Sequence, residues 1–567
     1  MIAFIREKNS WLYFCNPCKI LETYNIDEVE RLLIEASESG LYAAGFISYE
    51  ASSAFDSAFI NKKDFKLPLL SIGLYKDKII YDELPNFKKK NYKVGKLIPS
   101  VSKNTFLNKI KKIKSNIEAG NTYQVNYSYR LNGTFTGDTY EFFKYLINNQ
   151  NASYASYIST NNWSICSASP ELFFSLKSNI LTTKPMKGTA KRGKNLEEDI
   201  LESNLLKNSK KNQAENIMIV DMLRNDIGKV AEKGSVETLK TFELEKYPTL
   251  WQMTSTIKGY VSHKVPIIMK ALFPCASITG APKIKTMEII ENIENSPREI
   301  YTGTVGYITP GGDALFNVAI RTALINKKNK SISYGVGSGI VWDSIGEDEY
   351  EETQIKANIL LSKRYNFDLI ETMLWKPGTG VKLLKYHIKR IKSSADFFDR
   401  QFSEKNALNL INSVSSSSLL KLRLLLKQNG LLILEKYPFV NISKNKILKI
   451  KLSLNKTHSS NLFLRHKTSI RDAYDNARKN INDCDDVLLW NENDEVTEGT
   501  IYNIAIFKNN KWLTPSLDSG LLNGVMRQSM IESGKLEECK ITISDLKKAN
   551  KIKLFNSVQG SKKAILI

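Results

Sequence analysis

The chain has 567 residues, of which 42% are hydrophobic and 25% are charged, and its formal net charge is +22. This length exceeds what one hydrophobic core supports and predicts two to four domains, with the composition of an ordinary globular protein. No apolar run is long enough to span a bilayer, so no membrane association is expected. Residues 1–7 lack the basic-then-apolar order of a signal peptide, which predicts a cytoplasmic location.

The high net charge is not expected to reflect nucleic-acid binding. The basic residues are mostly lysine and are scattered through both halves, and no nucleic-acid recognition motif accompanies them. Six cysteines in so long a chain do not predict a disulfide framework. Cys15 and Cys18 have the spacing of half a zinc site, but there is no second such pair and there are only four histidines, so zinc is not expected.

In chain order, residues 1–100 are predicted to mix short strands and helices. The clearest helical period covers residues 103–120, where apolar residues recur at spacings of three and four from Phe106 to Ile117. Gly120 is expected to end this helix. Strands are predicted next, near 123–130, 152–158 and 163–174.

The elements that follow alternate in the same way. Helices are predicted near 195–207 and 211–224, after Pro282, and over 348–363, and strands over 301–308, 315–325 and 331–342. On the last helix Glu349, Glu352 and Lys356 share one face. A boundary is expected near 363–366, which divides the chain into 1–100, 101–363 and 367–567.

Two short strings contain residues suited to catalysis. Lys187 stands between a proline and a glycine-threonine turn, so stiff backbone precedes it and permissive backbone follows it. Sixteen residues earlier, Glu171 ends the string Ser-Pro-Glu. An amine and a carboxylate on neighbouring turns could serve as nucleophile and proton donor. On these two strings alone, a Lys–Glu surface pair between two strands remains an equal alternative.

Further unusual strings follow one another in order, at residues 122–126, 169–171, 187–189, 214–226, 278–283, 319–322, 335–340 and 349–353. With them, residues 40–362 resemble the chorismate-utilising enzymes, a family that includes anthranilate, isochorismate, salicylate and aminodeoxychorismate synthases. The resemblance implies an α+β domain with an antiparallel sheet core and flanking helices. It also implies that chorismate, which carries two carboxylates, a ring hydroxyl and an enolpyruvyl ether, is the substrate.

The resemblance assigns ligands to this substrate. Glu215, Glu349 and Glu352 could hold Mg²⁺, which would clamp one substrate carboxylate. The family places a further acid three residues before Glu215, where this chain has Asn212. The second carboxylate and the rest of the substrate are expected to contact Arg321, Lys356, the backbone amides of Gly337, Ser338 and Gly339, and also Gln124, Thr189, Thr279 and Gly280.

Two positions separate the chemistries within the family. Gln124 stands where isochorismate synthases have a lysine that activates water, so water is not expected to be the nucleophile. Lys187 stands where anthranilate synthases have alanine, and resembles the lysine of the aminodeoxychorismate synthase branch. There the lysine is thought to attack ring C2 and displace the C4 hydroxyl, with Glu171 as the acid, before ammonia enters at C4. The attacking amine must be neutral, which burial or a cationic neighbour such as Lys184 would favour.

The chain is not expected to make its own ammonia. A glutaminase needs an activated cysteine with a histidine partner, and Cys275 is expected to pack against the substrate loop instead. The resemblance implies a separate glutamine amidotransferase subunit, which free ammonia could replace. Gln252 occupies a position where many relatives have histidine, so hydrogen bonding is expected there rather than proton transfer.

After residue 366 the chain resembles fold-type IV pyridoxal-phosphate enzymes, the class IV aminotransferases. This resemblance implies a compact α/β domain of two subdomains. Lys467 matches the lysine that forms a Schiff base with the cofactor, and Glu498 the acid that pairs with its pyridine nitrogen. The remaining matched positions are Arg390, Asn503, Gly524, Val525 and Met526, of which Arg390 and the turn at 524–526 would bind the phosphate.

The two halves together predict a bifunctional enzyme of 4-aminobenzoate synthesis, the second half being an aminodeoxychorismate lyase. Lys467 would remove the proton at C4, and Thr372 would protonate the departing enolpyruvyl group. One alternative is an anthranilate synthase component with an appended aminotransferase-like domain. Another is a second half that lacks the cofactor and serves only for docking or structure.

Overall fold

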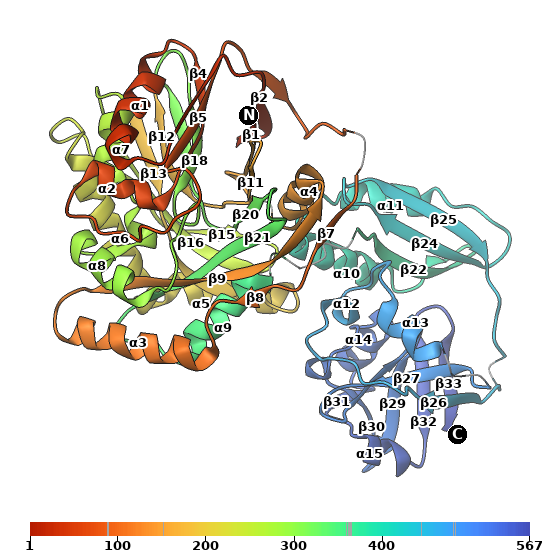
Figure 1. Ribbon diagram of the computed structural model, residues 1–567. Helices are drawn as coiled ribbons and strands as arrows, with labels where there is room; N and C mark the ends of the chain where they lie inside the picture. Colours follow the sequence, from red (N-terminus) through yellow and green to blue (C-terminus); the bar gives the residue numbers. More distant parts are fainter. Residues whose placement is uncertain are drawn as a thin grey trace. The chain divides into compact units, whose positions relative to one another are not determined.

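The computed structural model describes residues 1–567 except 88–89, 151, 359, 361–365, 444, 480 and 482. The chain forms two compact units (Figure 1), the first comprising Met1–Lys191 and Ser203–Arg364 and the second Arg192–Glu202 and Tyr365–Ile567. The boundary predicted at 363 lies outside the described residues. Among the residues that are described, no helix combines the length and the apolar character needed to cross a membrane.

The first unit contains two large sheets, and every strand pairing recorded in them is antiparallel. One sheet has 11 strands in the described part of the chain, with β7 (Tyr92–Val94) and β8 (Ile98–Pro99) pairing with β9 beside the main path. The main path runs β17 (Gly280–Ala281), β9 (Gln124–Gly137), β21 (Ser331–Ile340), β20 (Thr322–Asn326), β11 (Trp163–Ser167), β10 (Ser156–Ser159), β1 (Ile2–Glu7), β2 (Ser10–Phe14) and β6 (Ile79–Tyr81).

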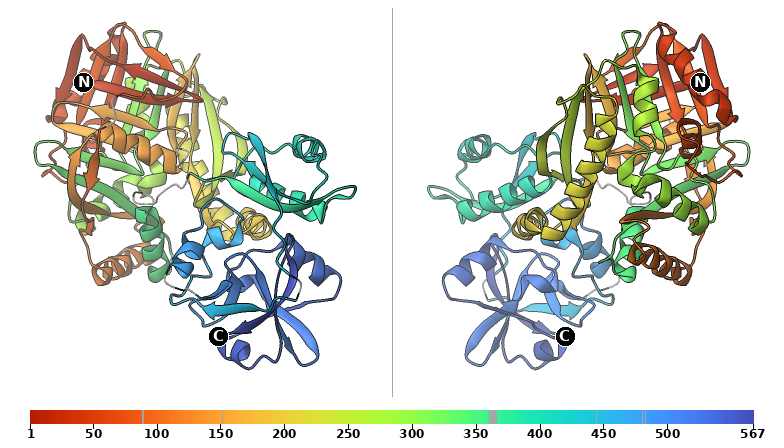
Figure 2. Two further views of the ribbon diagram at one scale, coloured as in Figure 1. Left: turned by 90° about the vertical axis from the view of Figure 1, so that its right-hand side faces the viewer. Right: turned by 90° about the vertical axis from the view of Figure 1, so that its left-hand side faces the viewer.

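The second sheet has 10 strands within the described residues, and β15 (Glu237–Lys246) pairs with β16 outside the main path. Strands distant in the sequence are neighbours here, since β4 pairs with β18, coloured red and green in Figures 1 and 2. The path is β14 (Met186–Lys191), β16 (Leu250–Tyr260), β13 (Ile180–Lys184), β12 (Leu172–Lys177), β19 (Ala314–Val318), β18 (Thr304–Ile308), β4 (Tyr42–Ile47), β5 (Leu70–Tyr75) and β3 (Lys19–Thr23).

Helices flank these sheets, as the family resemblance predicted. The helix predicted over 103–120 is confirmed as α3 (Lys103–Glu118), which buries Phe106 and Ile110 and begins at Ser102, whose side chain caps it. The helices predicted near 195–207, 211–224 and after Pro282 are also present, and the one predicted over 348–363 is present as far as Asn358, beyond which the prediction falls largely outside the described residues. The helices are α1 (Ile26–Glu38), α2 (Ser52–Phe55), α4 (Thr139–Gln150), α5 (Leu196–Asn208, which crosses the division between the units), α6 (Lys210–Gly228), α7 (Val265–Leu272), α8 (Lys283–Ile293) and α9 (Gly346–Asn358), with short 3-10 turns η1 (Tyr49–Ala51) and η2 (Ala276–Ile278).

Two predicted strands are broken in the structure. The strand predicted over 163–174 is divided into β11 and β12 because Pro170 lacks the N–H that a sheet ladder requires. The strand predicted over 315–325 is divided into β19 and β20 at Arg321, whose φ is +51°. Both interruptions carry predicted site residues, Glu171 and Arg321.

The second unit is α/β and contains two separate sheets, in agreement with the two predicted subdomains. The smaller sheet is antiparallel, and the larger one is mixed, with β26 parallel to both of its neighbours. The smaller sheet runs β23 (Gly380–Val381), β22 (Leu369–Lys376), β24 (Leu420–Leu426), β25 (Leu432–Pro438), and the larger one β28 (Val496–Gly499), β27 (Asp486–Trp490), β26 (Leu448–Leu452), β33 (Gly560–Leu566), β32 (Ile552–Asn556), β29 (Asn503–Lys508), β30 (Lys511–Pro515), β31 (Glu537–Cys539).

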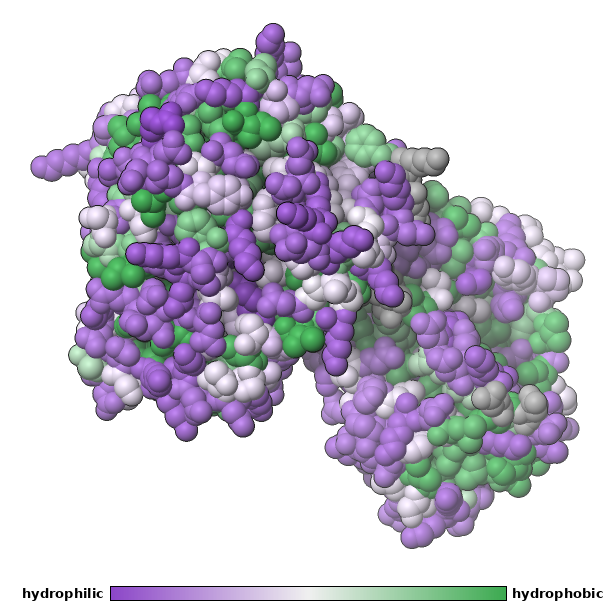
Figure 3. Space-filling model, viewed as in Figure 1, coloured by the Kyte–Doolittle hydropathy of each residue, from purple (hydrophilic) through white to green (hydrophobic). Residues whose placement is uncertain are grey.

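Helices of the second unit pack on these sheets. Figure 3 shows hydrophilic and hydrophobic side chains mixed on the visible surface. The serine run 415–418 lies in a loop, as predicted. The helices are α10 (Leu384–Phe397), α11 (Glu404–Asn412), α12 (Leu462–Arg465), α13 (Asp472–Arg478), α14 (Val525–Glu532) and α15 (Ile543–Lys547), with a 3-10 turn η3 (Leu517–Ser519).

Candidate active sites

A cavity of about 360 Å³ in the first unit collects most of the residues predicted to bind or react with the substrate. Its walls come from both sheets and from α6 and α9. The predicted residues that line it are Glu171, Lys187, Thr189, Glu215, Arg321, Gly337, Ser338, Gly339, Glu349, Glu352 and Lys356.

Lys187 reaches this cavity from β14. The next residue, Gly188, has φ of +98°, a conformation that glycine adopts without strain. The Lys187 Nζ lies 3.1 Å from an Oε2 of Glu215. A Cβ added to Gly339 would lie 2.7 Å from the same Nζ, so the absence of a side chain on β21 leaves the space that the amine occupies.

The neighbours of Lys187 differ from the expectation in one respect. Lys184 was expected to favour the neutral amine through its charge, but its Nζ pairs with Glu245, so that charge is compensated. Gln252 donates from Nε2 to the Gly188 carbonyl at 2.9 Å and accepts from Thr189 Oγ1 at 3.3 Å. The hydrogen-bonding role expected for Gln252 is therefore seen, and it fixes the strand that presents Lys187.

Glu171 is a buried carboxyl group with the properties of a proton donor. It is 2% exposed, and burial raises its pKa to about 7 even though Ser277 Oγ donates to its Oε1 at 2.7 Å. Cys275 lies two residues before Ser277, and its Sγ is 3.2 Å from Ser277 Oγ. Burial raises the pKa of Cys275 to about 12, so it packs beside the cavity as an inert thiol.

The carboxylates opposite Lys187 offer hard oxygen ligands. Glu349 and Glu352 both accept from Ser338 Oγ, the latter at 3.3 Å. Burial raises the pKa of Glu349, whereas for Glu352 the Lys356 ammonium, 2.7 Å away, overcomes burial and lowers the pKa. Within the described residues no group of three or more acidic, histidine or cysteine side chains is already assembled to hold a metal. Mg²⁺ needs only one or two protein carboxylates alongside water and substrate oxygens, so Glu349 and Glu352 fit it.

The remaining wall combines cations with backbone groups. Arg321 is half-buried, and its guanidinium lies over the Tyr247 ring at 5.4 Å. Lys356 donates to the Gly337 carbonyl at 2.9 Å. Strand β21 lies between β20 and β9. In the described structure, residues 331–334 of β21 pair with β20, whereas its pairing with β9 continues to Ile340. The edge of β21 that faces away from β9 is therefore open after Tyr334. Because N–H and C=O of one residue point to the same edge, the Gly337 amide shares this open edge with its carbonyl.

Three predicted binding residues lie behind the cavity wall instead of lining it. Thr279 donates from Oγ1 to the Cys275 carbonyl at 2.9 Å. A Cβ on Gly280 would lie 2.0 Å from the Gln124 carbonyl, so that position is a close approach of two backbones. Gln124 is buried, and neither polar atom of its amide has a partner in the described structure. The cavity-lining residues that the sequence did not predict include Asn126, Ser277, Tyr301 and Tyr334.

A second cavity, of about 350 Å³, lies in the second unit and is lined by every residue predicted to bind the cofactor there. It also contains Thr372, from β22. The predicted lining residues are Thr372, Arg390, Lys467, Glu498, Asn503, Gly524, Val525 and Met526.

Lys467 and Glu498 have shifted pKa values that suit a reactive amine and its acidic partner. Burial, with the Arg390 charge nearby, lowers the pKa of Lys467 to about 8. Burial raises the pKa of Glu498 to about 7. The Glu498 carboxyl group accepts from Tyr474 Oη at 2.8 Å, from the Leu522 amide at 3.0 Å and from Asn503 Nδ2 at 3.2 Å. These bonds fix the orientation of the acid.

Arg390 is held rigidly beside the turn at 523–525. Its Nε and Nη2 donate to the two oxygens of Glu371 at 2.8 and 2.7 Å, and its Nη1 donates to the Asn523 carbonyl at 3.2 Å. This pairing overcomes burial and lowers the pKa of Glu371 to about 2. At Gly524 a Cβ would lie 1.8 Å from Asn503 Oδ1, so any larger residue where α14 begins would displace the Asn503 amide that donates to Glu498.

These residues fit pyridoxal phosphate. A half-buried lysine with lowered pKa and a buried acid with raised pKa suit the aldehyde and the ring nitrogen of the cofactor. A glycine turn that opens a helix beside an arginine suits its phosphate. The sequence did not single out Tyr474, Arg471 or Lys421, which also line the cavity. They come from α13, the loop before it and β24, and only the tertiary fold brings them to the site.

Comparison with known proteins agrees with this division. Residues 7–362 match the chorismate binding enzyme family, and residues 368–562 match amino-transferase class IV. The aminodeoxychorismate synthase component 1 of Escherichia coli is 31% identical over 347 residues, which cover 57% of this chain and 76% of that protein. The chloroplastic aminodeoxychorismate synthase of Arabidopsis thaliana is 37% identical over 314 residues, 54% of this chain but 34% of that protein, so the chain spans only about a third of that relative.

The fold is also found in a solved structure. The anthranilate synthase component I of Streptococcus pneumoniae superposes with a TM-score of 0.56 at 24% identity, covering 64% of this chain and 92% of that one. The α+β architecture expected for the first half is thereby confirmed. The chain belongs to the chorismate binding enzyme family, and the remainder of the chain, over residues 368–562, matches amino-transferase class IV.

Proposed function

We propose that the chain catalyses two consecutive steps of 4-aminobenzoate synthesis. The first unit would convert chorismate and ammonia to 4-amino-4-deoxychorismate and water. The second would eliminate pyruvate from that product and leave the aromatic ring. The observation that supports this most strongly is the placement of Lys187 and Glu171 in one cavity with the carboxylates expected to hold Mg²⁺.

Lys187 favours amination at C4 over anthranilate formation. In the proposed step its Nζ forms a bond to ring C2 as the C4 hydroxyl departs, and Glu171 gives its proton so that water leaves. Ammonia then forms a bond to C4 and the lysine amine is expelled from C2, which restores the free side chain. An enzyme of this fold that makes anthranilate needs no such amine.

The substrate carboxylates are proposed to occupy opposite ends of the cavity. Glu349 and Glu352 would hold Mg²⁺, with Glu215 joining them once it is released from Lys187. The positive charge of the bound ion would offset one substrate carboxylate. Arg321 and the open edge of β21 would bind the other carboxylate through charge-assisted hydrogen bonds.

In the second unit the chain's own residues position the cofactor and move protons. Arg390 and the turn at 524–526 would bind the phosphate, and Glu498 would stay close to the pyridine nitrogen. The chemistry supplied by bound pyridoxal phosphate is that of an electron sink. Lys467 would take the proton from C4 of the substrate, and Thr372 would give a proton to the departing enolpyruvyl group.

Ammonia is proposed to come from a separate glutamine amidotransferase subunit. The relatives named component 1 imply a second component, and the buried, unreactive Cys275 does not provide a glutaminase nucleophile. Ammonium salts should replace that subunit in vitro.

The function is tested by the products formed from chorismate, ammonium and Mg²⁺, identified by chromatography and mass spectrometry. Without pyridoxal phosphate we expect 4-amino-4-deoxychorismate, and with it 4-aminobenzoate and pyruvate. Anthranilate as the main product would contradict the first assignment. Accumulation of 4-amino-4-deoxychorismate in the presence of the cofactor would contradict the second.

The pKa of Glu171 makes the amination step depend on pH. The acid form donates the proton, and burial holds its pKa near 7, so the supply of acid falls as the pH rises through 7. We expect a descending limb above about pH 7 in the amination rate at constant free ammonia. Glu171→Gln should lower the rate about 10²-fold or more and remove this limb. A limb that survives in Glu171→Gln would assign it to another group.

A further inference from the structure

Asn126 is a buried residue of the first cavity whose side-chain nitrogen has no hydrogen-bond partner within the described part of the chain. It lies in β9, is 7% exposed and lines the cavity. No hydrogen-bond partner for its Nδ2 exists among the described residues. Buried amide groups in folded proteins are almost always paired, because a lost hydrogen bond to water is not otherwise replaced. The geometry therefore suggests a partner supplied by a ligand.

The backbone of Asn126 is fixed on both sides. Its amide donates to the Thr279 carbonyl at 2.9 Å, and its carbonyl accepts from Arg298 Nη2 at 2.7 Å. Arg298 Nη1 also donates to the carbonyl of Ile278, at 3.1 Å. Ile278 is another lining residue, so one guanidinium holds two separate parts of the cavity wall.

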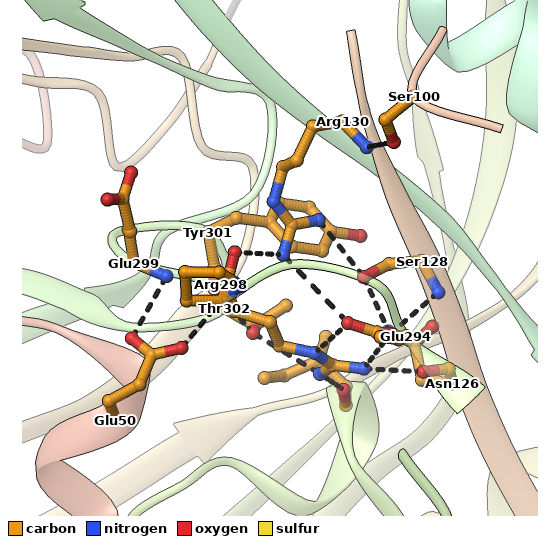
Figure 4. A network of polar contacts seen from close by, with 12 residues as sticks. Glu50, Ser100, Asn126, Ser128, Arg130, Glu294, Arg298, Glu299, Tyr301 and Thr302 are labelled. Carbon is orange, nitrogen blue, oxygen red and sulfur yellow. Dashed lines mark hydrogen bonds and ion pairs between the residues drawn. The ribbon is translucent and has the colours of Figure 1, made fainter. Parts of the chain in front are cut away.

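Arg298 is itself held by a buried acid (Figure 4). Glu294 accepts from Arg298 Nη2 at 2.7 Å and from Nε at 3.1 Å, and both side chains are almost completely buried. The same Glu294 accepts from the amide and the hydroxyl of Ser128, two residues after Asn126, at 2.9 and 2.8 Å. Glu50 accepts from the Arg298 amide at 2.6 Å. The network thus fixes β9 at Asn126 and at Ser128 to the segment after α8.

We propose that the side-chain amide of Asn126 donates a hydrogen bond to an oxygen atom of the substrate, and that the Arg298–Glu294 pair positions it. This inference rests on the proposed function, since chorismate offers carboxylate, hydroxyl and ether oxygens as acceptors. Gln124 also has an unpartnered amide, but it is not among the residues lining the cavity. Asn126 is therefore a binding residue, and Arg298 and Glu294 act through its backbone.

The test is the binding of chorismate to the full chain by isothermal titration, with Mg²⁺ and without ammonia. We expect Asn126→Ala to raise the dissociation constant about tenfold to a hundredfold, the loss typical of one hydrogen bond to a charged acceptor. Asn126→Asp should weaken binding further because a carboxylate repels the anionic substrate. Asn292→Asp, on the exposed face of α8, adds the same charge elsewhere and should bind normally.

The outcomes separate this inference from the proposed function. If the wild-type chain binds no chorismate, the proposed substrate is wrong. If the wild-type chain binds chorismate and Asn126→Ala binds it equally well, the substrate stands and the role of Asn126 is overturned.

The role of the Arg298–Glu294 pair must be tested by a measurement whose result differs from that of a general loss of stability. We expect Glu294→Gln and Arg298→Met to weaken chorismate binding at temperatures well below their melting points, and Arg298→Lys to restore part of it. Combining Glu294→Gln with Asn126→Ala should cost little more than Asn126→Ala alone, because both act on one contact. Fully additive losses would mean that the pair acts on the fold and not through Asn126.

Discussion

Replacing Lys187 with alanine is expected to lower the rate of chorismate amination by about 10³-fold or more, because the variant loses the nucleophile of the proposed first step. Chorismate binding should persist, since the cations and carboxylates of the cavity remain. Some anthranilate should form, because the rest of the site is shared with an anthranilate-forming fold. The measurement is the initial rate of each product, separated by chromatography, with ammonium as the nitrogen source.

The control for this variant is Lys191→Ala. Lys191 lies on the same strand, β14, but is exposed and does not line the cavity. It should retain the wild-type rate. Full amination activity in Lys187→Ala would remove the covalent role, and the Lys187–Glu215 pair would then be a structural contact.

Lys467→Ala is expected to lower the rate of pyruvate release by about 10³-fold or more while leaving the amination rate unchanged. The reason is that, in the proposed function, the one amine of Lys467 both anchors the cofactor and moves the proton at C4. A second readout does not depend on activity. After incubation with pyridoxal phosphate and borohydride reduction, the wild-type chain should carry the cofactor on the peptide that contains Lys467, and the variant should carry none there.

Lys449→Ala is the matched control, since Lys449 is an exposed lysine on β26 of the same unit. It should release pyruvate and be labelled at Lys467 as the wild-type chain is. If Lys467→Ala still released pyruvate at the normal rate, the second unit would use another amine. If wild-type Lys467 remained unlabelled, the second half would be a docking or structural domain.

Helices of the first unit were predictable where a regular spacing of side chains marks one face. In α3 the repeat from Phe106 onwards marks the buried face, and in α9 Glu349, Glu352 and Lys356 share one face. The strand ends were less predictable. Arg321 adopts φ of +51° in the middle of an apolar run, and nothing in the local sequence marks that reversal. Tertiary contacts determine the backbone conformation at such positions, whereas the periodicity of apolar residues predicts only the regular helices and strands.

In the candidate sites, the residues with proposed chemical roles were easier to predict than the residues that contribute through their backbone. Lys187 and Glu171 were singled out from two short strings, and Lys467 and Glu498 were assigned by the resemblance to class IV aminotransferases. Thr279 and Gly280 belong to an equally distinctive string, yet they pack behind the cavity wall.

Asn126 and Tyr334 come to the cavity from the paired strands β9 and β21. Their positions depend on a register between segments about two hundred residues apart, as the printed sequence shows. A single sequence gives no direct signal of that pairing.

The most direct test of the account is the mass of the peptide that carries Lys187 after the chain is mixed with chorismate and Mg²⁺ in the absence of ammonia and quenched. Without the second nucleophile the proposed adduct cannot proceed to product. We expect Lys187 to gain the mass of chorismate less one water, and to lose it when ammonium is added before quenching. An unmodified Lys187 in a chain that still forms 4-amino-4-deoxychorismate would contradict the mechanism.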